Sequence, residues 1–102
     1  MTNDWDKFST GDLVYIKNAE YNHPRIALFP DVEIVDDDAF GKILLFKGKH
    51  IWVKSGQLAM LLTVIKEVTI YTVASQVVCL AYDVGVWYTC RANVERVGKC
   101  TS

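Results

Sequence analysis

Apolar and polar residues follow one another along this chain in the pattern of short β-strands, and helical periodicity is nearly absent. Bursts of β-branched and aromatic residues end at Gly, Asn, Asp or Pro, which interrupt strands. The predicted strands cover residues 13–16, 26–29, 32–35, 43–46, 51–53, 64–73, 77–82 and 86–97. Pro30 separates two of them, because proline lacks the N–H that a strand ladder needs. Residues 57–61 fit either a helical turn or a strand.

The segment 43–53 is the clearest predicted hairpin. Gly48 can adopt the positive φ of a tight turn, so a Gly48-Lys49 turn would pair Phe46 with Ile51. Because side chains alternate along strands, the other face of this ribbon would gather cationic residues around a tryptophan. These candidate binding residues are Lys47, Lys49, His50, Trp52 and Lys54. Such a face can stack on bases while its lysines neutralise phosphates, unless the second half of the chain covers the tryptophan.

The second half of the chain contains a predicted turn and a motif that repeats one in the first half. Asp83-Val84-Gly85 predicts a type I turn closed by a left-handed glycine. Val86-Trp87 followed by Val94-x-x-Val97 also repeats Ile51-Trp52 followed by Leu58-x-x-Leu61, at an offset of 35 to 36 residues. The second half is then a shortened copy of the first, or the two share only a common hairpin pattern.

A resemblance covers about residues 10 to 61. The segment Gly11-Asp12-Leu13-Val14-Tyr15-Ile16 forms a first strand, and a polar loop and a strand at 26–35 follow. The pattern continues with 43–46, Ile51-Trp52-Val53 and a closing turn at Leu58-x-x-Leu61. This layout resembles the SH3-like small β-barrel and is similar to small uncharacterised proteins of tailed bacteriophages.

The expected fold is therefore all-β, with an SH3-like small barrel at its centre. We expect an N-terminal arm over 1–8, the barrel over 9–61, and a three-stranded β extension over 62–102. The extension packs on the barrel or forms a degenerate second barrel. Trp5 and Phe8 in the arm are expected to fold back onto the core or to serve as a short motif for a partner.

Composition and charge narrow the class of protein. Of 102 residues, 51% are apolar and 23% charged, which is the balance of a soluble globular domain. The longest apolar run is six residues, at 77–82, and the acidic start does not resemble a signal peptide, so we expect a cytoplasmic protein (host cytoplasm if phage-encoded). Residues 1–38 hold nine acidic and three basic side chains, whereas 39–102 hold three acidic and eight basic ones. The split marks two surfaces for different partners, or charges that neutralise each other in the fold.

Catalytic and metal chemistry find little support. The cysteines Cys79, Cys90 and Cys100 include no Cys-x-x-Cys pair, so we expect free thiols and no zinc site. No catalytic motif is present, and no enzymatic activity or cofactor is predicted. Asp36, Asp37 and Asp38 lack the spacing of a calcium loop, so no metal is predicted there. They are instead a candidate acidic patch for a basic protein partner.

Three functions remain open. The first is a non-enzymatic protein-interaction module, which the resemblance makes a small phage-type protein that binds a host or virion protein. The second is a nucleic-acid-binding module that uses the 47–54 segment, although a pI of about 6.0 is low for that class. The third is sequestration of a small molecule or nucleotide. The apolar surplus, with three tryptophans and five tyrosines, also predicts a homo-oligomer or a bound protein partner, and no membrane contact is expected.

Overall fold

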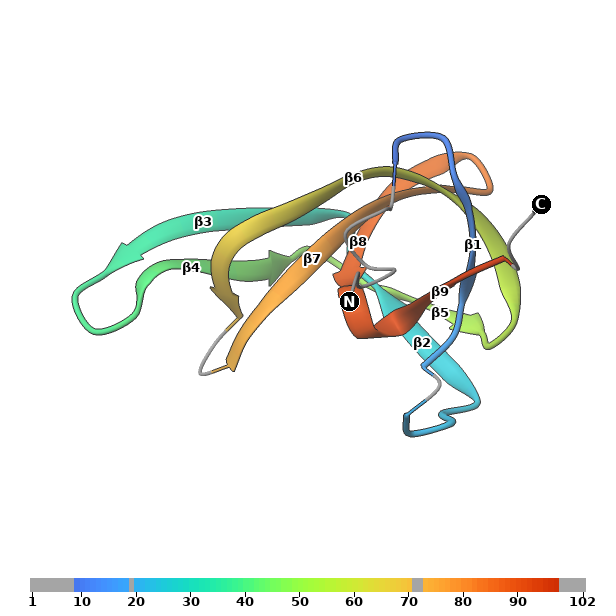
Figure 1. Cartoon of the computed structure of the whole chain (residues 1–102), viewed down its shortest axis with the longest axis horizontal. Coiled ribbons are helices and arrows are strands. Elements are labelled where there is room, and N and C mark those ends of the chain that lie inside the picture. The colour runs from blue at the N-terminus through green and yellow to red at the C-terminus, as the bar shows by residue number, and fades with distance from the viewer. Residues whose placement is uncertain (1–8, 19, 71–72, 98–102) are drawn as a thin grey trace, which may run out of the picture.

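The chain folds into two β-sheets (Figure 1). The computed structural model describes residues 9–18, 20–70 and 73–97, with side chains described outside 67–70 and 73–75. Strands make up 67% of it and no α-helix occurs in it, which confirms the all-β class. Neither sheet closes into a barrel within these residues. No helix in this part of the chain has the length and hydropathy to cross a membrane.

One long strand organises the larger sheet. The strands are β1 (Leu13–Ile16), β2 (Arg25–Leu28), β3 (Asp31–Asp37), β4 (Gly41–Lys47), β5 (Ile51–Lys54), β6 (Gln57–Ile70), β7 (Val73–Tyr82), β8 (Gly85–Cys90) and β9 (Val94–Arg96), and the 3-10 helix η2 (Arg91–Asn93) precedes β9. The larger sheet has the order β3-β4-β6-β1-β9, and β7 lies between β6 and β8. Strand β6 pairs with β1 through its first residues and with β4 through its last. The smaller sheet is the antiparallel ribbon β2–β5.

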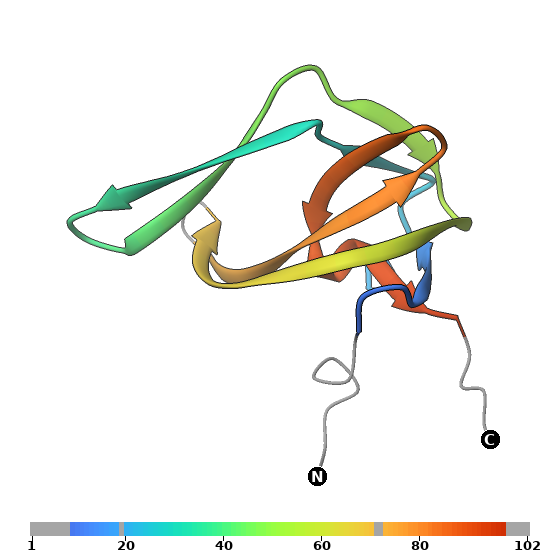
Figure 2. The same cartoon turned by 90° about the horizontal axis from the view of Figure 1, so that it is seen from above.

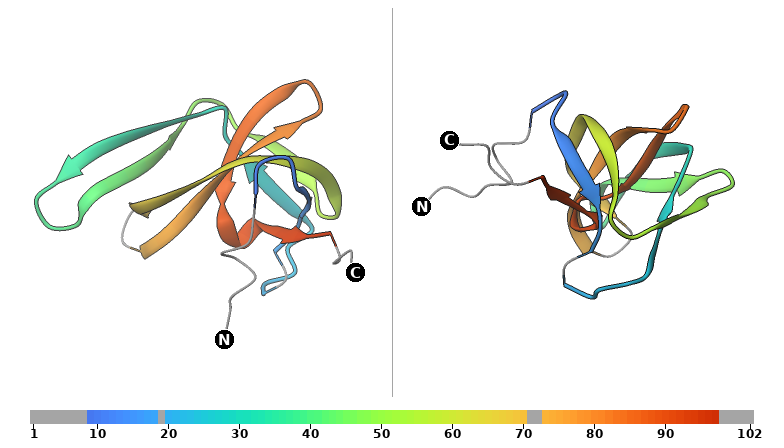
Figure 3. Two further views of the ribbon diagram at one scale, coloured as in Figure 1. Left: turned by 45° about the horizontal axis from the view of Figure 1, so that its top comes forward. Right: turned by 90° about the vertical axis from the view of Figure 1, so that its right-hand side faces the viewer.

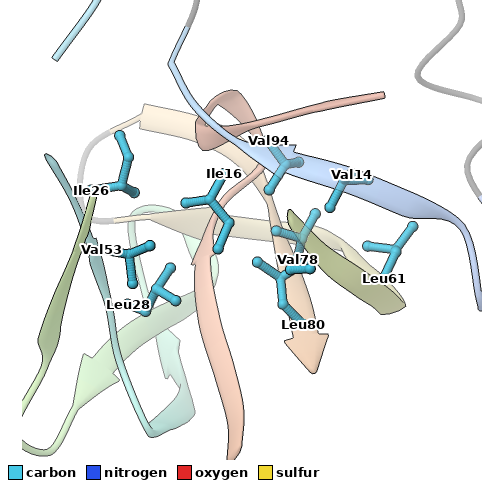
Figure 4. Packing of buried hydrophobic residues seen from close by; sticks show 10 residues of the cluster. Val14, Ile16, Ile26, Leu28, Val53, Leu61, Val78, Leu80 and Val94 are labelled. Carbon is cyan, nitrogen blue, oxygen red and sulfur yellow. The ribbon is translucent and has the colours of Figure 1, made fainter. Parts of the chain in front are cut away.

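The main core lies between the β2–β5 ribbon and the larger sheet. Figure 4 shows Ile26, Leu28 and Val53 pointing from the ribbon toward Ile16, Val78 and Leu80. Alternation explains which residues enter this core, because every second side chain of a strand faces the same side. In β1, for example, Val14 and Ile16 are fully buried, whereas Leu13 points outward.

The β3–β4 hairpin forms an arm that projects from the rest of the molecule (Figure 2). A short turn at 38–40 joins its two strands, and Gly41 follows with a φ of +79°. Leu44 and Val77 make a second small core cluster with Val32 and Phe46, which secures the arm. The turn of the arm lies at the opposite end of the molecule from β2 and β5 (Figure 3).

Several sequence predictions are confirmed. Strand β2 ends just before Pro30, and the ambiguous segment 57–61 belongs to strand β6.

Other predictions are corrected by the structure. The predicted strand 86–97 is interrupted, because η2 separates β8 from β9. The predicted boundary between 61 and 62 falls inside β6, and β9 pairs with β1. Residues Trp5 and Phe8 lie outside the described part of the chain.

The predicted 43–53 hairpin, and with it the ribbon at 47–54, is wrong. Strand β4 pairs with β3 along seven positions, from Asp31↔Lys47 to Asp37↔Gly41, and β5 pairs with β2. The pairing with β3 gives a longer ladder with apolar cross-strand contacts, which a four-residue hairpin could not match. Gly48 does take a positive φ of 88°, but its turn carries the chain from one sheet to the other.

The predicted turn at 83–85 is correct in place and wrong in detail. Asp83 adopts the positive φ, at +57°, and Gly85 is the first residue of β8. Asp is among the residues that tolerate the left-handed region, so the glycine is not needed for the turn. Gly85 instead leaves room for Trp87, since a Cβ there would lie 2.8 Å from the indole Nε1.

Candidate functional site

The outer face of the β2–β5 ribbon carries an exposed tryptophan. Since Ile26, Leu28 and Val53 face the core, the residues between them face outward. The register places Arg25 opposite Lys54, and Ala27 opposite Trp52. Trp52 is 56% exposed, so the described part of the second half of the chain does not cover it.

A row of aromatic rings continues from this tryptophan. The Trp52 ring meets the His50 ring edge-on at 5.2 Å, and His50 lies 5.1 Å from Phe29. Phe29 stacks on Phe46 with ring centroids 5.0 Å apart. The guanidinium carbon of Arg25 lies 5.2 Å from the centroid of Trp52, within the range of a cation–π contact. Exposed aromatic and cationic groups therefore share one surface.

This row borders an open pocket of about 300 Å³. Its lining residues are His23, Arg25, Ile26, Ala27, Phe29, Phe46, Trp52, Thr89, Cys90 and Asn93. The lining combines three aromatic carbon rings with basic and neutral polar groups, and no carboxylate occurs among its described residues. The pocket therefore suits a planar ligand that carries negative charge.

Hydrogen bonds hold the polar side of the pocket in place. Asn93 Nδ2 donates to Thr89 Oγ1 at 2.9 Å, and Thr89 Oγ1 donates to the carbonyl of Ala27 at 3.2 Å. Asn18 Nδ2 donates to Asn93 Oδ1 at 3.0 Å. Asn18 Oδ1 in turn accepts the N–H groups of Glu20 and Tyr21. The network ties the loop after β1 to η2 and orients the Asn93 amide before any ligand binds.

The structure places the predicted binding residues in two different regions. His50, Trp52 and the outward-facing Lys54 lie on or beside β5, and Lys49 is exposed in the connection before it. Lys47 ends β4, where its Nζ lies 2.7 Å from Glu33 Oε1, and this hydrogen bond raises the pKa of Lys47. Lys47 is therefore engaged with the acidic arm.

Sequence reasoning missed the contributions of β2, β4 and η2 to this site. Arg25, Phe29, Phe46 and Asn93 were not among the candidates, because β5 was expected to pair with β4. The sequence signal for this face is weak, because Ala27 and Phe29 are apolar like Ile26 and Leu28, so the run 26–29 does not show which side faces outward.

The acidic run lies in the arm and does not converge on one point. Asp36 is paired with Lys42 at 3.3 Å, and Asp37 Oδ2 accepts the N–H groups of Ala39 and Phe40. Asp36 and Asp37 are consecutive in a strand, so their side chains point to opposite faces. No group of three or more His, Cys, Asp or Glu side chains suited to a metal ion was found among the described residues.

The described thiols are in their protonated form at neutral pH. Cys79 and Cys90 are both free, and Cys79 lies opposite Tyr88 in the sheet. Burial raises the pKa of each thiol above its ordinary value. Since the thiolate is the reactive form, neither cysteine is activated as a nucleophile.

Comparison of the chain with protein-family models, with curated proteins and with solved structures found no match. Its function is therefore argued from the chemistry of the site, since a fold alone does not specify what a protein binds.

Proposed function

We propose that the protein is a non-enzymatic module that binds single-stranded nucleic acid, with bases stacked on Trp52 and phosphates held by nearby cations. The observation that carries the proposal is the exposure of Trp52, at 56%, beside Arg25 and His50. Only unstacked bases present their faces to an aromatic ring, which is why a single strand is the expected ligand.

The fold does not need this tryptophan for its own stability. Ile26, Leu28 and Val53 already anchor the ribbon in the main core. An indole that remains more than half exposed leaves much of its apolar surface in water, although covering that surface would be favourable. A stacked base would supply the missing cover.

The distribution of charge supports the proposal despite the overall charge of −1. Three of the twelve acidic residues, Asp36, Asp37 and Asp38, lie at the end of β3 and in the turn after it. The turn of this arm points away from β2 and β5 (Figure 1). Arg25, Lys49 and Lys54 therefore act on a ligand at Trp52 with little opposition from the acids at the far end of the arm.

The strand order also supports a relationship to SH3-like small barrels. Strands β9, β1, β6, β7 and β8 are neighbours in that order, and the last strand returns to pair with the first after a 3-10 turn. On this proposal the five strands lie within residues 13–16 and 57–96, and the segment 17–56 is a long insertion between β1 and β6. The similarity to small phage proteins remains a proposal from the sequence layout.

The test is fluorescence anisotropy of a labelled oligothymidine with wild type and Trp52→Ala between 50 and 200 mM salt. Loss of one stacked base costs about 1–3 kcal/mol, so Trp52→Ala should weaken binding roughly 5- to 150-fold. Wild-type affinity should fall steeply as salt rises. Phe40→Ala, an exposed aromatic residue in the turn of the arm, is the matched control and should bind like wild type. Binding that is insensitive to both salt and Trp52→Ala would contradict the proposal.

A second candidate function, protein interaction, is favoured by the outer face of the larger sheet. Leu13, Met60, Ala81 and Val86 lie side by side on β1, β6, β7 and β8. Three of them are 44–53% exposed, and Leu58 is exposed on the same face. A contiguous apolar row of this kind is typical of an interaction surface, for a second copy or for a host or virion protein.

Light scattering at increasing protein concentration tests self-association through this face. A dimer that becomes monomeric in Met60→Lys would support it. A wild-type protein that stays monomeric throughout would exclude a homo-oligomer, and capture of another protein through the same face would then be tested with the same variant.

A further inference from the structure

The pocket beside Trp52 has the size and polar groups to hold a single nucleotide. We propose that it accepts one base of the bound strand, with the hydrogen-bonding edge of that base directed at Asn93. This inference rests on the proposed function and adds the ligand class of the pocket. A volume of about 300 Å³ lies at the lower end of the range for small-molecule sites, so one nucleotide enters while its neighbours stay on the exposed face.

The aromatic wall of the pocket is held in place by the fold. Phe29 exchanges two backbone hydrogen bonds with Tyr88, at 2.9 and 2.7 Å. Phe46 packs against the cluster around Leu44 and stacks on Phe29. Since neither ring has to be ordered when a base arrives, stacking against this wall carries a small entropic cost.

The Asn93 amide supplies the means to recognise a base edge. Its Nδ2 already donates to Thr89 and its Oδ1 already accepts from Asn18. A side-chain amide has two N–H donors and two acceptor lone pairs, so one donor and one acceptor remain. Bases present neighbouring donors and acceptors on their edges, and asparagine pairs with such an edge through two hydrogen bonds. An abasic sugar offers no partner to this amide.

The phosphate of the same nucleotide has a cationic partner nearby. Arg25 lines the pocket, and no carboxylate is found among the described lining residues. A nucleoside 5′-monophosphate should therefore bind more tightly than the uncharged nucleoside, with an advantage that shrinks as salt rises.

Protection of Cys90 is a direct measure of occupancy, because Cys90 lines the pocket and is only half-buried. The wild-type protein is treated with N-ethylmaleimide in the presence of AMP, CMP, GMP, UMP or adenosine, and modification at Cys90 is followed by peptide mass. At least one nucleotide should slow the modification of Cys90, and AMP should protect at lower concentration than adenosine.

A second measurement changes the ligand and leaves the protein intact. Four-residue oligonucleotides, each with one position made abasic in turn, are compared by anisotropy competition. The position that enters the pocket should lose roughly 5- to 150-fold in affinity through the missing base edge. Asn93→Ala is first checked for folding by thermal unfolding. Its affinities for the different abasic oligonucleotides should then differ from one another less than those of the wild type do.

The outcomes separate this inference from the proposed function. Nucleotide protection of Cys90 together with one sensitive abasic position supports both. If oligonucleotides bind through Trp52 but no nucleotide protects Cys90 and no abasic position matters, the pocket inference is overturned and the proposed function stands. If nucleotides protect Cys90 but oligonucleotides do not bind, both are overturned, and the pocket is a site for free nucleotides.

Discussion

The two tryptophans Trp52 and Trp87 have similar sequence surroundings and opposite environments. Each follows a β-branched residue close to the start of a strand, in Ile51-Trp52 and Val86-Trp87. Trp52 is 56% exposed on the ribbon. Trp87 packs against the main core, and its Nε1 is buried with no hydrogen-bond partner among the described residues.

The two strands differ in which alternate set of side chains faces the core. In β5 the β-branched Ile51 packs against the core and the tryptophan faces out, whereas in β8 Val86 is exposed and the tryptophan faces in. Because side chains alternate with a period of two, a shift of one residue exchanges the two faces of a strand. The repeated motif therefore marks two different roles, a core residue in β8 and a candidate ligand platform in β5.

The largest expected effect is at Trp87, the partly buried tryptophan that packs against the main core. Trp87→Ala should lower the free energy of unfolding by about 3–5 kcal/mol, the usual cost of removing a large aromatic side chain from a core. Trp52→Ala should stay within about 0.5 kcal/mol of wild type, because its ring is mostly in solvent. Urea denaturation of both variants gives the two values, and equal losses would show that the environments are not distinct.

A smaller effect is expected at Gly85, which lies beside the Trp87 ring. Gly85→Ala would bring a Cβ to 2.8 Å from Trp87 Nε1, so the indole must shift within packed surroundings. We expect a loss of about 1–3 kcal/mol, as for other overpacked cores. Val84→Ala, at the exposed turn next to it, is the control and should be neutral. Unchanged stability in Gly85→Ala would mean that Trp87 is free to move.

The smallest expected effect is a difference in reactivity between the buried Cys79 and the pocket residue Cys90. Burial raises the pKa of Cys90 above its ordinary value near 9, so its thiolate fraction should keep rising as pH increases beyond 9. The rate of alkylation by iodoacetamide, followed by peptide mass, should rise in parallel. Cys79 also has a raised pKa and is buried, so it should react more slowly at every pH. If Cys79 is alkylated faster than Cys90, the pocket does not expose the Cys90 thiol as the structure describes.

Local patterns predicted much of the secondary structure but not the pairing of the strands. The break at Pro30 and the strand at 13–16 follow from residue type and alternation alone, whereas Val73, predicted to end the strand 64–73, begins β7. The partner of β5 does not, because β2 and β4 compete for it and the outcome depends on the total surface that each arrangement buries. Pairing with β2 brought Arg25 to Trp52, and the pairing of β4 with β3 brought Phe46 to Phe29.

The sequence by itself determined the all-β class, the positions of most strands, and an aromatic residue flanked by cations at 49–54. Only the tertiary structure decided that Trp52 is exposed, that Lys47 belongs to the acidic arm, and that η2 supplies Asn93 to a pocket on the β2–β5 ribbon. The physical reason is that alternation is a local property of each strand, whereas the face turned to the core and the choice of neighbour are set by contacts between residues far apart in the chain.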